Sequence, residues 1–155
     1  MIPSGGRVLD VASGSGRHAR WLAARGYHVD ALDRDTEALT SLADVAGVRT
    51  LCADIENGRW PCERGVYAGV IVTNYLHRPL FPELVAALAR DGVLIYETFA
   101  VGNERYGRPS NPAFLLQPGE LLEVVRGRLR VIAYEDLYVD EPRPAVVQRL
   151  CARLE

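Results

Sequence analysis

Apolar residues along the chain follow two patterns, and the two patterns alternate. Short runs bounded by Gly, Pro, Asp or Asn are typical of strands, whereas apolar residues spaced three or four apart are typical of helices. The predicted strands are Arg7–Val11, Tyr27–Asp33, Val48–Ala53, Val66–Thr73, Val93–Thr98, Leu129–Val139 and Val146–Leu154. The predicted helices are Arg17–Arg25, a segment from its cap residue Asp35 to about Asp44, Pro82–Arg90 and Pro118–Val125.

The order of these elements predicts the fold class. Strands that alternate with helices form parallel sheets, and the continuous apolar run Val66–Thr73 is typical of a strand buried on both faces. The last two strands are joined only by the turn Asp140–Pro144, so they should pair antiparallel. We therefore expect an α/β protein with a Rossmann-like fold, in which a mostly parallel seven-stranded sheet ends in an antiparallel C-terminal strand pair. The 155 residues are enough for a single domain with a sizeable core.

Composition and charge narrow the class of protein. Hydrophobic residues make up 48% and charged residues 25% of the chain, which is ordinary for a soluble globular protein. The net charge of −2 provides no field that would draw the chain to nucleic acid or to a membrane, so neither is an expected partner. The cysteines are isolated and lack zinc-site spacing, and no signal peptide is recognisable, so we expect a cytoplasmic protein without a metal.

A glycine turn follows the first predicted strand. Gly14 and Gly16 lack Cβ atoms, so the backbone can bend sharply there and a ligand can lie against it. The next helix begins near Arg17 and directs its free N–H groups and its positive dipole end into the same space. Asp10 lies at the end of the strand, four residues before Gly14. This arrangement predicts the floor of a cofactor-binding site.

Two cofactors, NAD and S-adenosylmethionine, are candidates for binding at this turn. Gly14, Gly16 and Ala19 fit the dinucleotide fingerprint G-x-G-x-x-G/A, but three small residues are a weak signal. The fingerprint places its first glycine directly after the strand, whereas Asp10 and three further residues intervene here. A carboxylate at this place suits an amino-acid moiety that carries an ammonium group, and it suits a pyrophosphate poorly. The turn therefore favours S-adenosylmethionine over NAD.

Polar residues follow the other predicted parallel strands. Asp33 ends the second strand, 19 residues after Gly14, where a carboxylate can accept hydrogen bonds from both ribose hydroxyls of either cofactor. Asp54 ends the third strand, and this second acid adds support for S-adenosylmethionine. Asn74 follows the fourth strand, close to the point where strand order reverses and ligands bind in open α/β sheets.

Candidate groups for the acceptor side lie in the segments after the fourth and fifth strands. Ala100–Asn111 is a long polar loop, and such loops are often functional. Within it, Arg105 and Arg108 flank an aromatic residue and could clamp an anionic or planar group. The candidates for alignment of the acceptor or for general-base chemistry are Tyr75, His77, Glu97 and Tyr106. Each has a structural alternative, such as a loop anchor for His77 or an ordering role for Glu97.

The motif D-x-A-x-G-x-G, from Asp10 to Gly16, resembles the first motif of class I S-adenosylmethionine-dependent methyltransferases. The whole chain resembles small bacterial members of this class, including the tellurite-resistance methyltransferase-like group. The resemblance implies five parallel strands followed by an antiparallel pair. It also implies that the turn holds the methionine end of the cofactor, Asp33 the ribose, and Asp54 with Ile55 the adenine. The full set expected to bind the cofactor is Asp10, Ala12, Gly14, Ser15, Gly16, Asp33, Arg34, Asp54, Ile55 and Asn74.

The chain departs from the family pattern at two places. Asp91-Gly92 replaces the usual proline-glycine-glycine before the fifth strand, and this change should be harmless. Only seven residues precede Val8, where family members carry a helix that covers the cofactor. This suggests a truncated chain, a misassigned start or an open site.

The segment Thr73–Pro79 lacks the N/D-P-P-Y/F/W signature of amino-group methylation on nucleobases and glutamine, so these acceptors are less favoured.

The resemblance implies methyl transfer to a small-molecule acceptor by direct displacement at the sulfonium methyl group. The cofactor carries the reactivity, and the protein supplies alignment and exclusion of water. A general base is needed only where the nucleophile must lose a proton. Two alternatives stay open: an NAD-type dinucleotide-binding domain, and a non-catalytic S-adenosylmethionine-binding module that acts through a partner.

Overall fold

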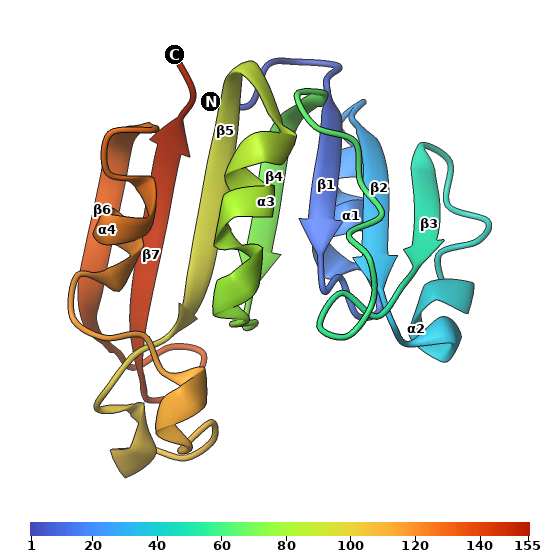
Figure 1. The fold of residues 1–155 in the computed structure, drawn as a ribbon. Helices are drawn as coiled ribbons and strands as arrows, with labels where there is room; N and C mark the ends of the chain where they lie inside the picture. Colours follow the sequence, from blue (N-terminus) through green and yellow to red (C-terminus); the bar gives the residue numbers. More distant parts are fainter.

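The computed structural model describes residues 1–155, and its centre is a seven-stranded sheet (Figure 1). The strands are β1 (Arg7–Val11), β2 (His28–Asp33), β3 (Val48–Cys52), β4 (Tyr67–Thr73), β5 (Leu88–Phe99), β6 (Arg130–Val139) and β7 (Ala145–Arg153). The α-helices are α1 (Arg17–Ala23), α2 (Thr36–Thr40), α3 (Phe81–Ala87) and α4 (Glu120–Val125). Three short 3-10 helices are η1 (Arg78–Leu80), η2 (Asn103–Arg105) and η3 (Pro112–Phe114).

The strand order is β3-β2-β1-β4-β5-β7-β6. The first five strands along the chain pair in parallel. Strand β7 pairs antiparallel with both β5 and β6. The predicted α/β fold with an antiparallel C-terminal pair is therefore confirmed. Strand order reverses between β1 and β4, so their carboxyl ends are the expected place for a ligand.

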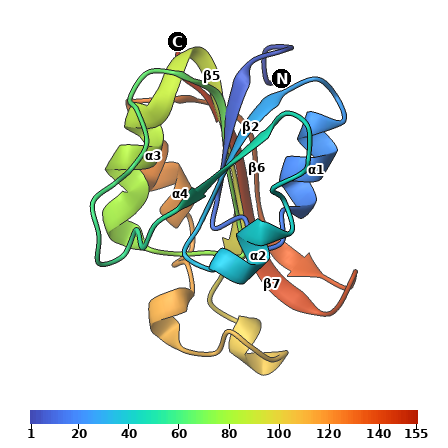
Figure 2. The same ribbon diagram turned by 90° about the vertical axis from the view of Figure 1, so that its right-hand side faces the viewer.

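Helices cover both faces of the sheet (Figure 2). The larger apolar cluster lies under α3 and α4, and the smaller one lies under α1 and α2. Successive residues of a strand point to opposite faces of the sheet. In β1, Val8 therefore belongs to the smaller cluster and Leu9 to the larger one. Strands β1 and β4 are thus apolar on both sides, as their sequences predict.

Helix boundaries differ from the prediction at four places. Helix α1, predicted to end at Arg25, ends at Ala23. The helix predicted for Pro82–Arg90 ends at Ala87, because Leu88 is extended and pairs with Tyr67 as the first residue of β5. Helix α4 starts only at Glu120, after a left-handed N-cap at Gly119, so Pro118 precedes the helix instead of occupying its first turn. Helix α2 ends at Thr40, and turns continue the chain to Asp44.

The predicted cap of α2 is confirmed. The Asp35 carboxylate caps α2 by accepting hydrogen bonds from the backbone N–H groups of Glu37 and Ala38, at 3.0 and 3.1 Å. Gly26 has a φ of 83° and closes the turn after α1, where left-handed backbone favours glycine. No helix of the structure combines the length and the apolar character needed to cross a membrane.

The amino ends of the strands are joined by a charged cluster around Asp30, a residue of β2 that is only 4% exposed. Its carboxylate accepts hydrogen bonds from Arg7 Nε, Arg49 Nε and the Tyr67 hydroxyl, each at 2.8 Å. Burial raises the pKa of Asp30, but the hydrogen bonds from Arg49 and Tyr67 and the charge of Arg7 outweigh burial, so the pKa is lowered. The cluster therefore ties β1, β2, β3 and β4 together around an ionised carboxylate.

Candidate functional site

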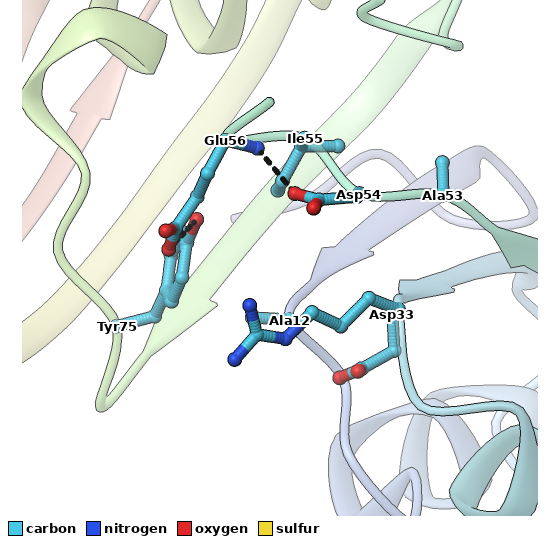
Figure 3. Close-up of a pocket in the computed structure, with 8 residues that line it drawn as sticks. Ala12, Asp33, Ala53, Asp54, Ile55, Glu56 and Tyr75 are labelled. Atoms are coloured by element: carbon cyan, nitrogen blue, oxygen red, sulfur yellow. Dashed lines mark hydrogen bonds between the residues drawn. The ribbon is translucent and has the colours of Figure 1, made fainter. Parts of the chain in front are cut away.

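A cavity of about 210 Å³ lies at the carboxyl ends of β1, β2 and β3, on the side of β4 (Figure 3). Its lining is Ala12, Asp33, Arg34, Ala53, Asp54, Ile55, Glu56 and Tyr75. Tyr75 and Glu56 lie together on one side, with Asp33 on the other (Figure 3). Ala12 follows β1 and Tyr75 follows β4, so the cavity sits where strand order reverses, as expected for a ligand site. We call it the first cavity.

The two glycines of the turn after β1 serve different purposes. Gly14 has a φ of 53°, and a Cβ atom added there would meet nothing within 4 Å, so the space beside its backbone is open. Gly16 has a φ of 77°, and an added Cβ would lie 2.5 Å from both methyl groups of Leu42. Gly14 thus leaves room for a ligand, whereas Gly16 lets the turn pack against the hydrophobic cluster under α1 and α2.

Asp33 is held by backbone donors at the end of β2. Its Oδ2 accepts a hydrogen bond from the Gly14 N–H at 2.7 Å, and its Oδ1 accepts one from the Asp35 N–H at 2.9 Å. A carboxylate oxygen can accept more than one hydrogen bond. The carboxylate is therefore oriented by the glycine turn and keeps acceptor capacity at the cavity.

Asp54 is exposed and organises the loop after β3. Its Oδ1 accepts hydrogen bonds from the backbone N–H groups of Glu56 and Asn57, and its Oδ2 accepts one from the Asn57 amide at 3.1 Å. The bonds from Asn57 and then Glu56 lower the pKa of Asp54. Asp54 is therefore ionised at neutral pH, and the turn that it caps places Ile55 against the cavity.

Asp10 lies beneath the turn instead of on the cavity wall. Its side chain is buried, with the residue 1% exposed, and Oδ2 accepts a hydrogen bond from the Ala19 N–H at 3.1 Å. Burial raises the pKa of Asp10 to about 7. Asp10 therefore connects β1 to α1 and supports the turn from below. Ser15 is exposed at the tip of the same turn and does not line the cavity.

A second cavity, of about 390 Å³, adjoins the first. Its lining is Arg34, Glu56, Asn74, Tyr75, Leu76, Thr98, Phe99, Pro109 and Phe114. Arg34, Glu56 and Tyr75 line both cavities and form a wall that they share. Asn74 has a φ of 54°, and its N–H donates to the Glu97 carbonyl at 2.9 Å, which fixes the turn after β4.

Tyr75 is the one predicted catalytic residue that lines either cavity. Its hydroxyl donates a hydrogen bond to Glu56 Oε1 at 3.0 Å. Burial and this hydrogen bond raise the pKa of Tyr75, so the hydroxyl is a donor at neutral pH. Tyr75 can therefore orient a ligand at the shared wall, but it does not supply a phenolate base there.

The other three candidates are engaged in structural contacts outside both linings. The carbonyl of His77 accepts a hydrogen bond from the Leu80 N–H at the start of η1. Glu97 is half-buried and forms an ion pair with Arg149 at 2.6 Å. The ring of Tyr106 lies 5.0 Å from that of Tyr138, between ring centroids.

Sequence reasoning missed several lining residues. In the first cavity these are Ala53 and Glu56, and only their positions beside Asp54 could have pointed to them. In the second cavity they are mostly apolar residues from the end of β5 and from the loops, where no periodicity shows which side chains face a ligand. The missed apolar residues are Leu76, Phe99, Pro109 and Phe114.

A family described as a methyltransferase domain matches residues 8–92, more than half of the chain. The chain therefore belongs to the methyltransferase domain family. No curated protein matches it in sequence. The family and the fold confirm the prediction of a class I methyltransferase, the class that uses S-adenosylmethionine as cofactor.

Solved structures share the fold at low sequence identity. TehB from Haemophilus influenzae is 17% identical with a TM-score of 0.83, and the match covers 99% of this chain but 59% of TehB. An S-adenosylmethionine-dependent methyltransferase from Mesorhizobium loti is 18% identical with a TM-score of 0.78, and 99% of this chain and 94% of that chain are covered. The 1,6-didemethyltoxoflavin-N1-methyltransferase of Burkholderia thailandensis, solved with S-adenosylhomocysteine, is 18% identical with a TM-score of 0.69 over 96% of this chain and 70% of that chain.

Proposed function

We propose that this chain, as one domain over residues 1–155, transfers the methyl group of S-adenosylmethionine to a small-molecule acceptor. The observation that carries the proposal is the pair of adjoining cavities at the carboxyl ends of the parallel strands. The first cavity has carboxylates at the ends of β2 and β3, and the second has a mainly apolar lining. Because the two cavities share a wall, a cofactor in the first and an acceptor in the second would lie next to each other.

The residues of the first cavity fit the cofactor. The open space beside Gly14 and the acceptor capacity of Asp33 suit the methionine end and the ribose, respectively. Asp54 Oδ2 has one protein donor and retains a lone pair for the adenine amino group, with Ile55 as an apolar surface for the ring. The residues that we propose for cofactor binding are Asp10, Ala12, Gly14, Ser15, Gly16, Asp33, Arg34, Asp54, Ile55 and Asn74. Of these, Asp10 would act through the turn that it supports, since it does not line the cavity.

When bound, S-adenosylmethionine supplies an electrophilic methyl group on a sulfonium sulfur. The protein then has to align an acceptor atom with this methyl group and keep water away. The Tyr75 hydroxyl donates its one proton to Glu56, so its oxygen can accept a hydrogen bond from a ligand at the wall between the cavities. Tyr75 is therefore the strongest of the four catalytic candidates, and His77, Glu97 and Tyr106 would act by shaping the surrounding loops.

The dimensions support a small acceptor. Each cavity is open to the surface, and together they reach the range of about 300–1,000 Å³ that is typical of small-molecule sites. The net charge of −2 gives no general attraction for RNA. A polar hydroxyl at the wall and apolar side chains beyond it are the usual composition of a pocket for a small organic molecule.

Calorimetric titration with S-adenosylhomocysteine tests the cofactor, with NADH as the competing ligand. We expect saturable binding of S-adenosylhomocysteine and none of NADH. Asp33→Asn should weaken this binding, whereas Asp44→Asn should not, because Asp44 is exposed and lies outside the cavity. Binding of NADH alone would instead support the dinucleotide-binding alternative.

Transfer of label from methyl-labelled S-adenosylmethionine to a panel of small acceptors tests the reaction. We expect a labelled product, and Tyr75→Phe should slow its formation without weakening cofactor binding. Tight cofactor binding without transfer to any acceptor, together with a stable protein partner, would favour the non-catalytic binding module.

A further inference from the structure

A third cavity, of about 440 Å³, continues from the second one. Its lining is Phe99, Arg108, Pro109, Ser110, Asn111, Phe114 and Arg143. Phe99, Pro109 and Phe114 line both the second and the third cavity. The three cavities therefore form a continuous series that starts at the glycine turn and ends at two arginines. We call the second and third cavities together the acceptor groove.

The two arginines at the end of the groove have no acidic partner. Arg108 belongs to the loop before η3, and Arg143 belongs to the turn between β6 and β7. Neither forms an ion pair or a side-chain hydrogen bond, and no carboxylate lines the third cavity. By contrast, Arg78 and Arg149 are paired with Glu120 and Glu97. Two unpaired guanidinium groups beside one cavity are suited to an anionic ligand.

Aromatic side chains connect these cations to the cofactor cavity. Phe114 is 53% exposed, although it is large and apolar. Phe99 lies beside it in the groove, and the Arg143 guanidinium is 5.9 Å from the centroid of the Phe99 ring. The floor of the groove therefore offers flat apolar surfaces in its middle and positive charge at its far end.

We infer that the acceptor groove binds a planar aromatic molecule that carries a carboxylate. Its rings would lie on Phe99 and Phe114, and its carboxylate would bind Arg108 and Arg143. As the acceptor assignment, this inference rests on the proposed function. It also revises the clamp expected from the sequence, because Arg105 and Tyr106 do not line the groove and Arg143 takes the place of Arg105 beside Arg108.

Binding of 2-naphthoate and of its neutral isostere 2-naphthamide tests this inference. Each probe is titrated into the full chain, with and without saturating S-adenosylhomocysteine. We expect naphthoate to bind about tenfold more tightly than naphthamide, because hydrogen bonds to a charged group are stronger than those to a neutral group by enough to change the dissociation constant about tenfold. Arg108→Gln and Arg143→Gln should each weaken naphthoate binding by about tenfold and leave naphthamide binding unchanged.

Arg128→Gln is the matched control, because Arg128 is exposed, forms no side-chain hydrogen bond and precedes β6 at the opposite edge of the sheet. Unfolding curves establish that each variant is folded. Equal binding of the two probes, failure of naphthoate to bind at millimolar concentration, or a preference that survives in both arginine variants would overturn the inference. Arginine-dependent naphthoate binding without any binding of S-adenosylhomocysteine would support the groove and contradict the proposed function.

Discussion

Strand β2 carries an aspartate toward each end, and the two are used differently. Asp30 accepts hydrogen bonds from the side chains of Arg7, Arg49 and Tyr67 inside the protein. Asp33, three residues further along, accepts hydrogen bonds from backbone N–H groups and lines the first cavity. Aspartate on one strand thus stabilises the fold at the amino ends of the strands and contributes to the ligand site at their carboxyl ends.

The two aspartates differ in the groups that donate hydrogen bonds to them, and this difference decides whether the carboxylate can also bind a ligand. Charged side-chain donors neutralise a carboxylate and fill its lone pairs, so Asp30 has little left to offer a ligand. Backbone donors fix the orientation of a carboxylate without neutralising it. Asp33 therefore keeps acceptor capacity where the strands end.

The largest effect is expected for Asp30→Ala. Loss of the carboxylate leaves the Tyr67 hydroxyl buried without its acceptor and Arg49 without its partner, while Arg7 keeps only Glu63. We expect the free energy of unfolding in urea to fall by about 3 kcal/mol. Binding of S-adenosylhomocysteine by the folded protein should be unchanged, and a parallel loss of affinity would contradict the separation of the two edges.

The pH dependence of the stability of Asp30→Asn tests whether the charge of Asp30 is responsible for its stabilising effect. Because the native pKa of Asp30 is lowered, its stabilisation is present above the pKa of the unfolded state and is lost as the pH falls through the native pKa. The difference in stability between wild type and Asp30→Asn should therefore shrink below about pH 4. A difference that stays constant with pH would show that packing, not charge, is responsible.

Asp33→Asn should have the next largest effect, and on binding instead of stability. The amide cannot accept as strongly from two ribose hydroxyls, so we expect the dissociation constant for S-adenosylhomocysteine to rise about 100-fold. The free energy of unfolding should fall by only about 1 kcal/mol, because Gly14 or Asp35 loses one charge-assisted bond. Unchanged affinity in a folded variant would remove Asp33 from the site.

Asp10→Asn should stabilise the protein at high pH. The native pKa of about 7 lies above the unfolded value, so the stability contributed by Asp10 is fully present below the unfolded pKa and is lost as the pH rises through the native pKa. The amide oxygen can still accept from the Ala19 N–H. We expect a gain of about 2 kcal/mol near pH 8 and no gain near pH 4, measured by urea unfolding against Asp44→Asn. Destabilisation at both pH values would contradict this.

Arg49→Gln should have the smallest effect. The Arg49 side chain is 58% exposed, and Asp30 keeps two other donors. We expect a loss of less than about 1 kcal/mol that decreases further in high salt. Arg7→Gln should destabilise more, because the Arg7 side chain is 29% exposed and its guanidinium also lies over the Tyr67 ring. The reverse order would show that exposure does not govern these ion pairs.

Most of the fold could be predicted from the sequence because its strands are apolar runs with clear ends. Cap chemistry was equally informative, and Asp35 caps α2 as expected. The end of α3 could not be predicted, because Leu88 is apolar and suits either a helix or a buried strand. Only its pairing with Tyr67 decides between them.

The candidate site was predictable where its residues end a strand or directly follow one. Asp33 and Asp54 line one cavity because the carboxyl ends of parallel strands meet at the same edge of the sheet. Arg108 and Arg143 are 35 positions apart in irregular segments, and nothing in their local sequence indicates that they line one groove. Their roles, like that of Asp10, stay predictions to be tested.

The most direct test of the account is amide chemical-shift mapping by NMR during titration with S-adenosylhomocysteine. We expect saturable shifts for Gly14, Asp33 and Ile55 at the first cavity, whereas the signals of Arg7 and Arg49 at the amino ends of the strands should stay unchanged. Absence of any shift, or shifts centred on the Asp30 cluster, would contradict the claim that the cofactor binds at the carboxyl ends of the strands.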